Sequence, residues 1–203
     1  MNPLPIVVLI SGGGTNLQSI IDRIADKTLN ARLCAVISNK ADAYGIERAK
    51  NANISIEIID HKQYDSRESF DAELTQCIEK YQPQLIVLAG FMRILTDDFV
   101  NHFYGKMINI HPSLLPKYRG IHTHQRALEA GDDIHGLSIH YVSTKLDGGP
   151  VILQKSVAVL EHDSEETLAK RVLEQEHIAY PQVIQWVAEG RLQLSDNQVM
   201  NLV

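Results

Sequence analysis

The chain has 203 residues, of which 44% are hydrophobic and 22% charged, and this composition suits one globular domain with a core of its own. Its formal net charge of -6 argues against a general nucleic-acid binder, which is more often basic. The acidity still permits a phosphorylated small molecule, because backbone N–H groups and a few local cations can hold a phosphate.

Cysteine usage and the N-terminus bear on the cell compartment. Cys34 and Cys77 form no CxxC motif, and we expect both to be buried, reduced thiols. The N-terminal apolar run has no basic residues before it, is too short to span a bilayer, and is followed at once by glycines. We therefore expect a buried first strand, no targeting or membrane segment, and a cytoplasmic protein.

Short apolar runs alternate with longer amphipathic stretches in the first half of the chain. The pattern predicts strands at 5–10, 32–38, 55–60, 84–89 and 106–111, and helices at 16–27, 42–52, 66–81 and 96–103. Alternating strands and helices predict a Rossmann-like α/β fold with a mostly parallel sheet and helices on both faces. The nearly continuous apolar strands agree with a sheet covered on both sides.

The rhythm changes after residue 111. A long loop rich in Pro and His is expected over 112–135, and two further strands at 136–144 and 151–159 are joined by the turn KLDGGP. We expect this pair to form an antiparallel addition to the sheet. A helix is predicted at 164–190, where Pro181 should kink or divide it. No stretch has the composition of a linker, so we expect a single domain over residues 1–203.

The sequence SGGGTNLQ (11–18) lies between the first strand and the first helix. Glycines here let a backbone approach a ligand closely, and free N–H groups at a helix start favour an anion. The stretch is neither a full dinucleotide fingerprint, because Leu17 stands where the third glycine would fall, nor a P-loop, because no GK[ST] follows. The local pattern leaves a phosphate site and a tight turn without a ligand equally open.

Asn109 and His111 end the fifth predicted strand within NIHPSLLPKYRG. Two residues apart on a strand, their side chains point to the same side, at the edge where open α/β folds bind ligands. The alternative is a loop-capping Asn and a solvated His.

Asp147, in KLDGGP, precedes two glycines that permit close approach of the backbone to a ligand, although the bare sequence favours a hairpin turn over a catalytic loop. An Asp beside His111 would orient the ring and favour its charged form. A metal site at the His122–His124 pair is the competitor, but Cys pairs and an HExxH motif are absent from the sequence.

Three stretches together resemble the phosphoribosylglycinamide formyltransferases, and the resemblance is collinear from about residue 5 to residue 190. They are SGGGTNLQ, then GFMRIL (90–95) with NIHPSLLPKYRG, then GLSIHYVSTKLDGGPVI (136–152). The last two also mark the wider group that uses 10-formyltetrahydrofolate. The glycine turn and the single-domain length narrow the resemblance to the ribonucleotide enzymes.

The resemblance implies the formyltransferase fold and roles for particular residues. About 1–105 would form the nucleotide- and phosphate-binding half, and about 106–203 the catalytic and folate-binding half. Catalysis is implied for Asn109, His111 and Asp147. Phosphate and ribonucleotide binding are implied for Gly14, Thr15, Asn16 and Glu176. Folate binding is implied for Arg67, Met92, Arg93, Ile94, Leu95, Asn109, Ser143 and Asp147.

The implied activity is transfer of a formyl group from 10-formyltetrahydrofolate to the amine of N1-(5-phospho-D-ribosyl)glycinamide in de novo purine biosynthesis. We expect small-molecule substrates, no metal, no nucleic acid, no membrane, and a monomer or homodimer. A 10-formyltetrahydrofolate hydrolase and a transferase acting on initiator tRNA are the related alternatives. Such relatives usually carry an extra N-terminal or C-terminal domain, which we do not expect here. A non-catalytic nucleotide-binding module would be expected to lack part of the trio, yet Asn109, His111 and Asp147 are all present.

Overall fold

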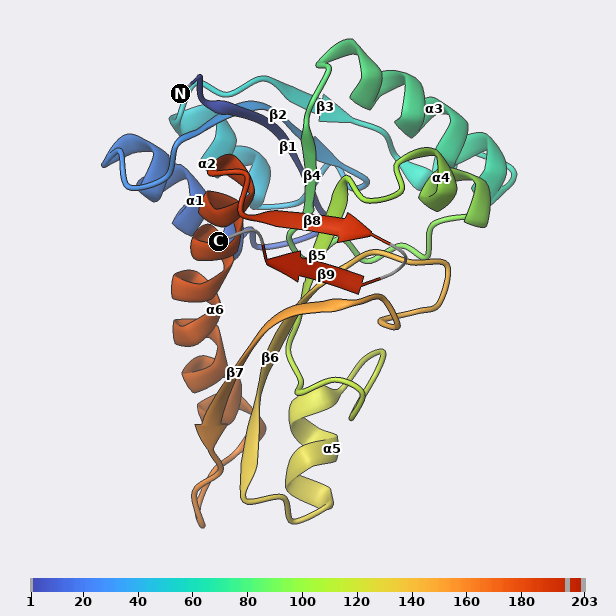
Figure 1. The fold of residues 1–203 in the computed structure, drawn as a ribbon. Coiled ribbons are helices and arrows are strands. Elements are labelled where there is room, and N and C mark those ends of the chain that lie inside the picture. The colour runs from blue at the N-terminus through green and yellow to red at the C-terminus, as the bar shows by residue number, and fades with distance from the viewer. Residues whose placement is uncertain (1, 196–197, 202–203) are drawn as a thin grey trace.

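The computed structural model describes residues 2–195 and 198–201 and places a seven-stranded sheet at the centre of the molecule (Figure 1). The strand order is β3-β2-β1-β4-β5-β6-β7, with parallel pairing from β3 to β5 and antiparallel pairing of β6 and β7. The strands are β1 Leu4–Ile10, β2 Ala31–Ser38, β3 Ile56–Ile58, β4 Leu85–Leu88, β5 Met107–His111, β6 Ile134–Tyr141 and β7 Val151–Ala158. The predicted α/β sheet with an antiparallel addition is confirmed.

Helices cover both faces of this sheet (Figure 1). α1, α2 and α6 pack on one face, and α3 and α4 on the other. The helices are α1 Thr15–Ala25, α2 Gly45–Asn51, α3 Arg67–Lys80, α4 Asp97–His102, α5 Thr123–Glu129 and α6 Glu165–Ala188, with a short 3-10 helix at His61–Gln63. Among the described residues, no helix is long and apolar enough to cross a membrane.

The interior strand β1 contributes to both hydrophobic cores. Ile6, Val8 and Ile10 belong to the core under α1, α2 and α6, whereas Val7 and Leu9 belong to the core under α3 and α4. Successive side chains of a strand point to opposite faces, so a strand covered on both faces must be apolar throughout. The N-terminal apolar run is continuous because both faces of β1 are covered.

Three features differ from the sequence-based expectation. The loop expected over 112–135 contains α5 and the first residues of β6. α5 is only seven residues long, and its N-cap His122 makes no side-chain capping bond, so no strong start signal marked it. α6 runs without division from Glu165 to Ala188 although Pro181 lies inside it. A small hairpin of β8 Leu192–Ser195 and β9 Gln198–Asn201 follows α6 and was not foreseen.

The sheet reverses its strand order at β1, and this positions the site. From β1 the chain runs through α1 to β2 on one side, whereas β4 pairs with the other side of β1. In open α/β sheets, ligands bind in the crevice beyond the carboxyl ends of strands at such a reversal. The loops that leave β1 and β4 are the glycine turn and the segment containing Met92–Leu95.

Candidate active site

The loops after β1 and β4 are joined by hydrogen bonds around Ser11. The Ser11 backbone N–H donates to the Gly90 carbonyl over 3.2 Å, and the Met92 N–H donates to the Ser11 Oγ over 2.7 Å. The Ser11 hydroxyl in turn donates to the Oδ1 of Asn39 over 2.6 Å. The predicted phosphate turn and the predicted folate loop are therefore held side by side at one edge of the sheet.

The glycine turn ends in the N-cap of α1. Gly14 has the left-handed φ of +68° that favours glycine, and a Cβ there would lie 2.7 Å from the Gly45 Cα. The N–H groups of Thr15 and Asn16 belong to the first turn of α1, which lacks internal acceptors. They border a hollow lined by Ser11, Gly12, Gly13, Gly14, Thr15, Asn16, Lys40, Ala89, Gly90 and Met92. This arrangement suits an anion.

Glu176 of α6 reaches the same helix start. The Asn16 Nδ2 donates to the Glu176 Oε2 over 2.7 Å. The carboxyl is buried, and burial raises its pKa above the ordinary value, although the Asn16 hydrogen bond opposes that shift. Within the described part of the chain, the Asn16 Oδ1 is buried without a hydrogen-bond partner. The pair thus offers a buried acceptor and a carboxylate beside the glycine turn.

On β5, Asn109 lies directly opposite His140 of β6. The Asn109 Nδ2 is 3.3 Å from the His140 Nε2, and the His140 Nδ1 is 2.8 Å from the Tyr141 carbonyl oxygen. Burial lowers the pKa of His140, which favours a neutral ring that donates from Nδ1 and accepts at Nε2. One amide N–H of Asn109 is therefore occupied by His140, which fixes the direction of the other.

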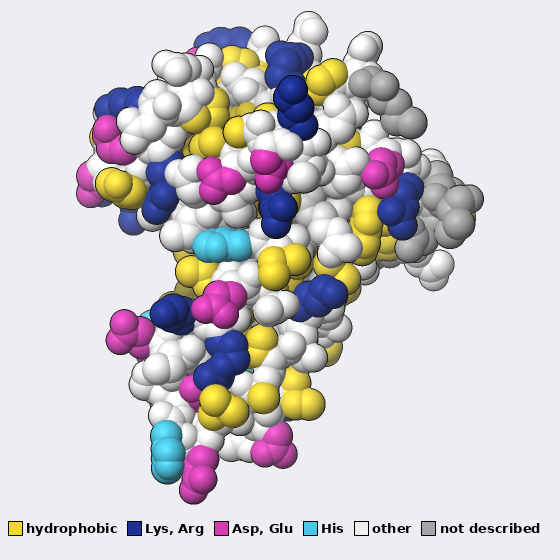
Figure 2. All heavy atoms as spheres, turned by 90° about the vertical axis from the view of Figure 1, so that its left-hand side faces the viewer, with side chains coloured by type: hydrophobic (Ala, Val, Ile, Leu, Met, Phe, Trp, Pro, Cys, Tyr) yellow, Lys and Arg dark blue, Asp and Glu magenta, His cyan; other side chains and the backbone are white. Residues whose placement is uncertain are grey.

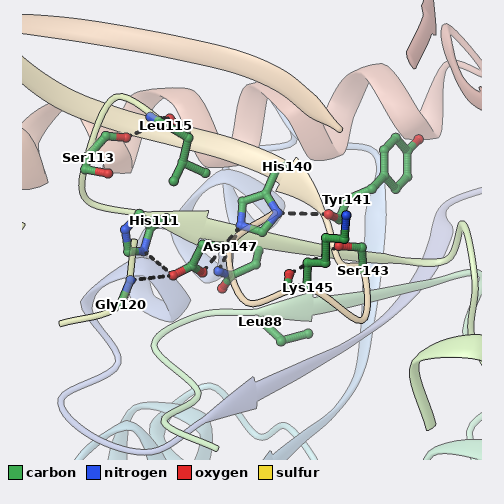
Figure 3. A network of polar contacts seen from close by, with 12 residues as sticks. Leu88, His111, Ser113, Leu115, Gly120, His140, Tyr141, Ser143, Lys145 and Asp147 are labelled. Atoms are coloured by element: carbon green, nitrogen blue, oxygen red, sulfur yellow. Dashed lines mark hydrogen bonds and ion pairs between the residues drawn. The ribbon is translucent and has the colours of Figure 1, made fainter. Parts of the chain in front are cut away.

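His111, His140 and the backbone of Gly120 converge on Asp147 (Figure 3). The His111 Nδ1 lies 3.5 Å from the Asp147 Oδ2, which also accepts the Gly120 N–H over 2.9 Å. The other ring nitrogen of His111 lies 2.9 Å from the Tyr118 carbonyl oxygen. Both nitrogens of this buried ring thus face acceptor oxygens, so either nitrogen is placed to donate a hydrogen bond.

A cavity opens beside Asn109 and Asp147. It is lined by Leu88, Phe91, Arg93, Ile94, Leu95, Val100, Asn109, His140, Val142, Ser143, Thr144, Lys145, Leu146 and Asp147. Apolar walls with a few polar groups and two backbone loops suit a flat heteroaromatic ring, whose edges need hydrogen bonds. The loop of Arg93 is held where the Thr96 N–H donates to the Oδ2 of the buried Asp71 over 2.6 Å.

The predicted folate residues do not all lie in this cavity. Arg93, Ile94, Leu95, Asn109, Ser143 and Asp147 line it. Met92 is exposed and lines the hollow of the glycine turn instead, and Arg67 is exposed at the first position of α3. His111 is not among the lining residues, because its ring lies buried between Asp147 and the Tyr118 carbonyl.

Sequence reasoning missed several residues that contact or line these sites, among them His140, Lys40 and Arg48. His140 orients Asn109, Lys40 lines the glycine hollow, and Arg48 of α2 donates to the Gly13 carbonyl. His140 carried a signal, because it alternates with Ser138 along a predicted strand. Arg48 carried none, since it is one basic residue in an ordinary amphipathic helix.

The chain resembles known formyltransferases over nearly its whole length. A family model described as formyl transferase matches residues 4–184. The chain is 54% identical over 192 residues to the phosphoribosylglycinamide formyltransferase of Escherichia coli (strain K12), covering 95% of this chain and 91% of that protein. The solved phosphoribosylglycinamide formyltransferase of Coxiella burnetii, in complex with CHES, is 55% identical with a TM-score of 0.95, covering 98% of this chain and 94% of that chain. Glycinamide ribonucleotide transformylase 1 from Symbiobacterium toebii is 42% identical with a TM-score of 0.96, covering 100% and 95%.

Proposed function

The chain belongs to the formyl transferase family, and we propose that it transfers the formyl group of 10-formyltetrahydrofolate to the amine of phosphoribosylglycinamide, in purine biosynthesis. The observation that carries this proposal is that two sites adjoin at one sheet edge: the hollow of the glycine turn (the glycine hollow) and the cavity beside Asn109 and Asp147 (the trio cavity). Met92, whose N–H donates to Ser11, lines the first, and the next residue, Arg93, lines the second. A phosphate held at one and a folate held at the other would bring the amine and the formyl carbon together. Positioning of this kind can supply much of a rate enhancement.

The ribonucleotide occupies the glycine hollow in this proposal. Its phosphate accepts hydrogen bonds from the backbone of Gly14, Thr15 and Asn16, with Lys40 nearby as a cation. The Glu176 carboxyl accepts from the ribose hydroxyls. The folate ring enters the apolar cavity along Arg93–Leu95 and Ser143–Asp147, and the outer part of the folate runs toward Met92 and Arg67.

The reaction proceeds by attack of the neutral amine on the formyl carbon, which forms a tetrahedral species with a negative oxygen. Asn109 donates its second amide N–H to that oxygen, because His140 already holds the first. His111 is the second donor. It passes a proton to the folate nitrogen as the bond between that nitrogen and the formyl carbon breaks, and the proton that the attacking amine loses returns to the ring. Asp147 keeps the imidazolium aligned. The formyl donor is already activated, so this chemistry needs neither a metal nor a covalent enzyme intermediate.

The segment after β5 must move for this to happen. The Tyr118 carbonyl occupies the Nε2 of His111, and the Gly120 N–H occupies one oxygen of Asp147. A substrate that reaches His111 displaces the Tyr118 carbonyl. The base of the segment can stay in place, because Ser138 of β6 donates to the Ser113 carbonyl and accepts from the Leu115 N–H.

The partners are these two small molecules, and the compartment is the cytoplasm. Basic and acidic side chains are interspersed on the face over α1, α2 and α6 (Figure 2), which gives no continuous basic surface there for a nucleic acid. The chain acts as one unit. Residues up to about 105 supply the phosphate loop, and later residues supply the trio. The cavity beside Asn109 is lined by residues of both halves, and Glu176 of the second half reaches Asn16 beside the glycine turn.

The test is a spectroscopic assay of folate product with both substrates and with each omitted in turn, for wild type and His111→Ala. We expect product only with both substrates, and a loss of about 100-fold or more in kcat for the variant. Product that forms equally fast without the ribonucleotide would identify a formyl hydrolase and would remove the acceptor role of the glycine turn.

A further inference from the structure

The carbonyl groups of the glycine turn all have partners on α2 or α1. The Gly12 carbonyl accepts the Gly45 N–H over 3.0 Å, and the Gly13 carbonyl accepts the Arg48 Nε over 2.8 Å. The Gly14 carbonyl accepts the N–H of Gln18 over 2.9 Å, as the first bond of α1. The turn is therefore held from one side by a main-chain group and by one side chain of α2.

These contacts determine where the N–H groups of the turn point. In a planar trans peptide, the carbonyl of one residue and the N–H of the next point in opposite directions. The Gly13 carbonyl points at Arg48, so the Gly14 N–H points away from α2. The Gly12 carbonyl points at the Gly45 N–H, so the Gly13 N–H also points away from α2. Successive N–H groups aligned in this way form an anion-binding concavity.

The Arg48 side chain is itself fixed by its neighbours. Its NH1 donates to the Gln18 Oε1 over 3.1 Å, and its guanidinium lies 5.1 Å from the centre of the Tyr44 ring. Gln18 in turn donates to Asp22 over 2.8 Å. A planar guanidinium held at two donor atoms and one face has little freedom left, so it fixes the Gly13 carbonyl in one direction.

We propose that Arg48 is a positioning residue for the ribonucleotide phosphate: it holds the Gly13 carbonyl and so directs the Gly14 N–H into the glycine hollow. This inference rests on the proposed function, which places the phosphate there. Arg48 lines a neighbouring hollow together with Asp22 and Asp26, so two carboxylates accompany its charge. Arg48 therefore contributes to phosphate binding mainly by orienting the peptide group between Gly13 and Gly14, and less by long-range electrostatic attraction.

The experiment compares Arg48→Met and Arg48→Lys with wild type and with Arg23→Met as a matched control. Arg23 lines the same hollow as Arg48, but its guanidinium faces Asp26 at 3.8 Å. Kinetics with both substrates are combined with the stabilisation of each protein against heat by inorganic phosphate, which needs no turnover. Arg48→Lys keeps the charge but lacks the planar fork that contacts Gly13 and Gln18 together.

We expect Arg48→Met to raise the KM for the ribonucleotide by about tenfold, to lose most of the stabilisation by phosphate, and to keep the KM for the folate. Arg48→Lys should show much of the same defect, and Arg23→Met none. An unchanged ribonucleotide KM in Arg48→Met overturns the inference, and a full rescue by Arg48→Lys assigns the effect to charge instead. If wild type itself does not use the ribonucleotide, the proposed function fails first.

Discussion

The glycine turn and the trio cavity lie at the same sheet edge but present different chemical groups to a substrate. The turn presents peptide groups. It needs a glycine at Gly14, because the backbone there is left-handed and closely packed and leaves no room for a Cβ. The trio presents side chains, and each is set by a partner: Asn109 by His140, and His111 by Asp147 and the Tyr118 carbonyl. A substitution at the turn should therefore weaken binding, whereas one in the trio should slow the chemical step.

Asn109→Ala tests the trio side of the comparison and should give the largest effect. Removal of one pre-placed donor to a developing oxyanion costs about 2.7–4 kcal/mol, so kcat should fall about 100- to 1000-fold. The KM for the ribonucleotide should stay near that of wild type. Steady-state kinetics with each substrate varied in turn measure both quantities.

The matched control is Asn101→Ala, which removes an exposed amide on α4. It should retain the kcat of wild type. A kcat for Asn109→Ala within tenfold of wild type would take Asn109 out of the chemical step, and the division of labour between the two regions would fail there.

Gly14→Ala tests the turn side. The new Cβ would meet the Gly45 Cα at 2.7 Å, and the φ of +68° is strained for alanine. The turn must shift, and its hydrogen bonds to a charged phosphate, each worth roughly 1.5–3 kcal/mol, are lost or lengthened. The KM for the ribonucleotide should rise roughly 10- to 150-fold, with a smaller change in kcat at saturation.

Gly190→Ala separates strain from the clash. Gly190 has a φ of +68° at the end of α6, but a Cβ there meets nothing within 4 Å. It should lower the melting temperature slightly and leave both KM values unchanged. If Gly14→Ala instead lowers kcat while its ribonucleotide KM stays unchanged, the turn is not the binding element.

The two regions also differ in how far the sequence predicts them. The continuous apolar runs were sufficient for the parallel sheet, because only strands covered on both faces need them. Asn109 and His111 could be placed on one side of a strand end by their spacing alone. The pairing of Asn109 with His140 could not, because the register of β5 against β6 brings them together across a sequence separation of 31 residues.

The sequence also fails to predict the contacts that hold the glycine turn. Its glycines predicted an unusual backbone conformation, but the sequence did not distinguish a ligand site from a turn without a ligand. Arg48 lies 35 residues from Gly13, and nothing in its own helix indicates the carbonyl that it holds. Helix α5 and the β8–β9 hairpin were missed for a different reason, since they are short and lack strong start or turn signals.

Glu176→Gln gives the smallest change in rate and tests whether the buried carboxylate beside the turn is kept for function. Burial makes the pKa of Glu176 higher in the folded protein than in the unfolded chain. The folded state then binds the proton more tightly, so wild type loses stability as pH rises from the unfolded pKa to the folded one. Gln cannot ionise and keeps an oxygen for Asn16. The variant should therefore match wild type in stability near pH 4 and exceed it at pH 7.5.

The same substitution should raise the KM for the ribonucleotide by about tenfold, because a neutral amide accepts more weakly from ribose hydroxyls than a carboxylate does. Urea unfolding at both pH values and steady-state kinetics provide the measurements, with Glu174→Gln, an exposed glutamate on the same helix, as the control. A variant that is more stable at pH 7.5 and binds the ribonucleotide less tightly would show that α6 gives up stability for binding. If the variant and wild type are equally stable at both pH values, the Glu176 carboxylate does not destabilise the folded protein. If the variant has the same KM for the ribonucleotide as wild type, the carboxylate does not take part in ribose recognition, and the turn binds through its peptide groups alone.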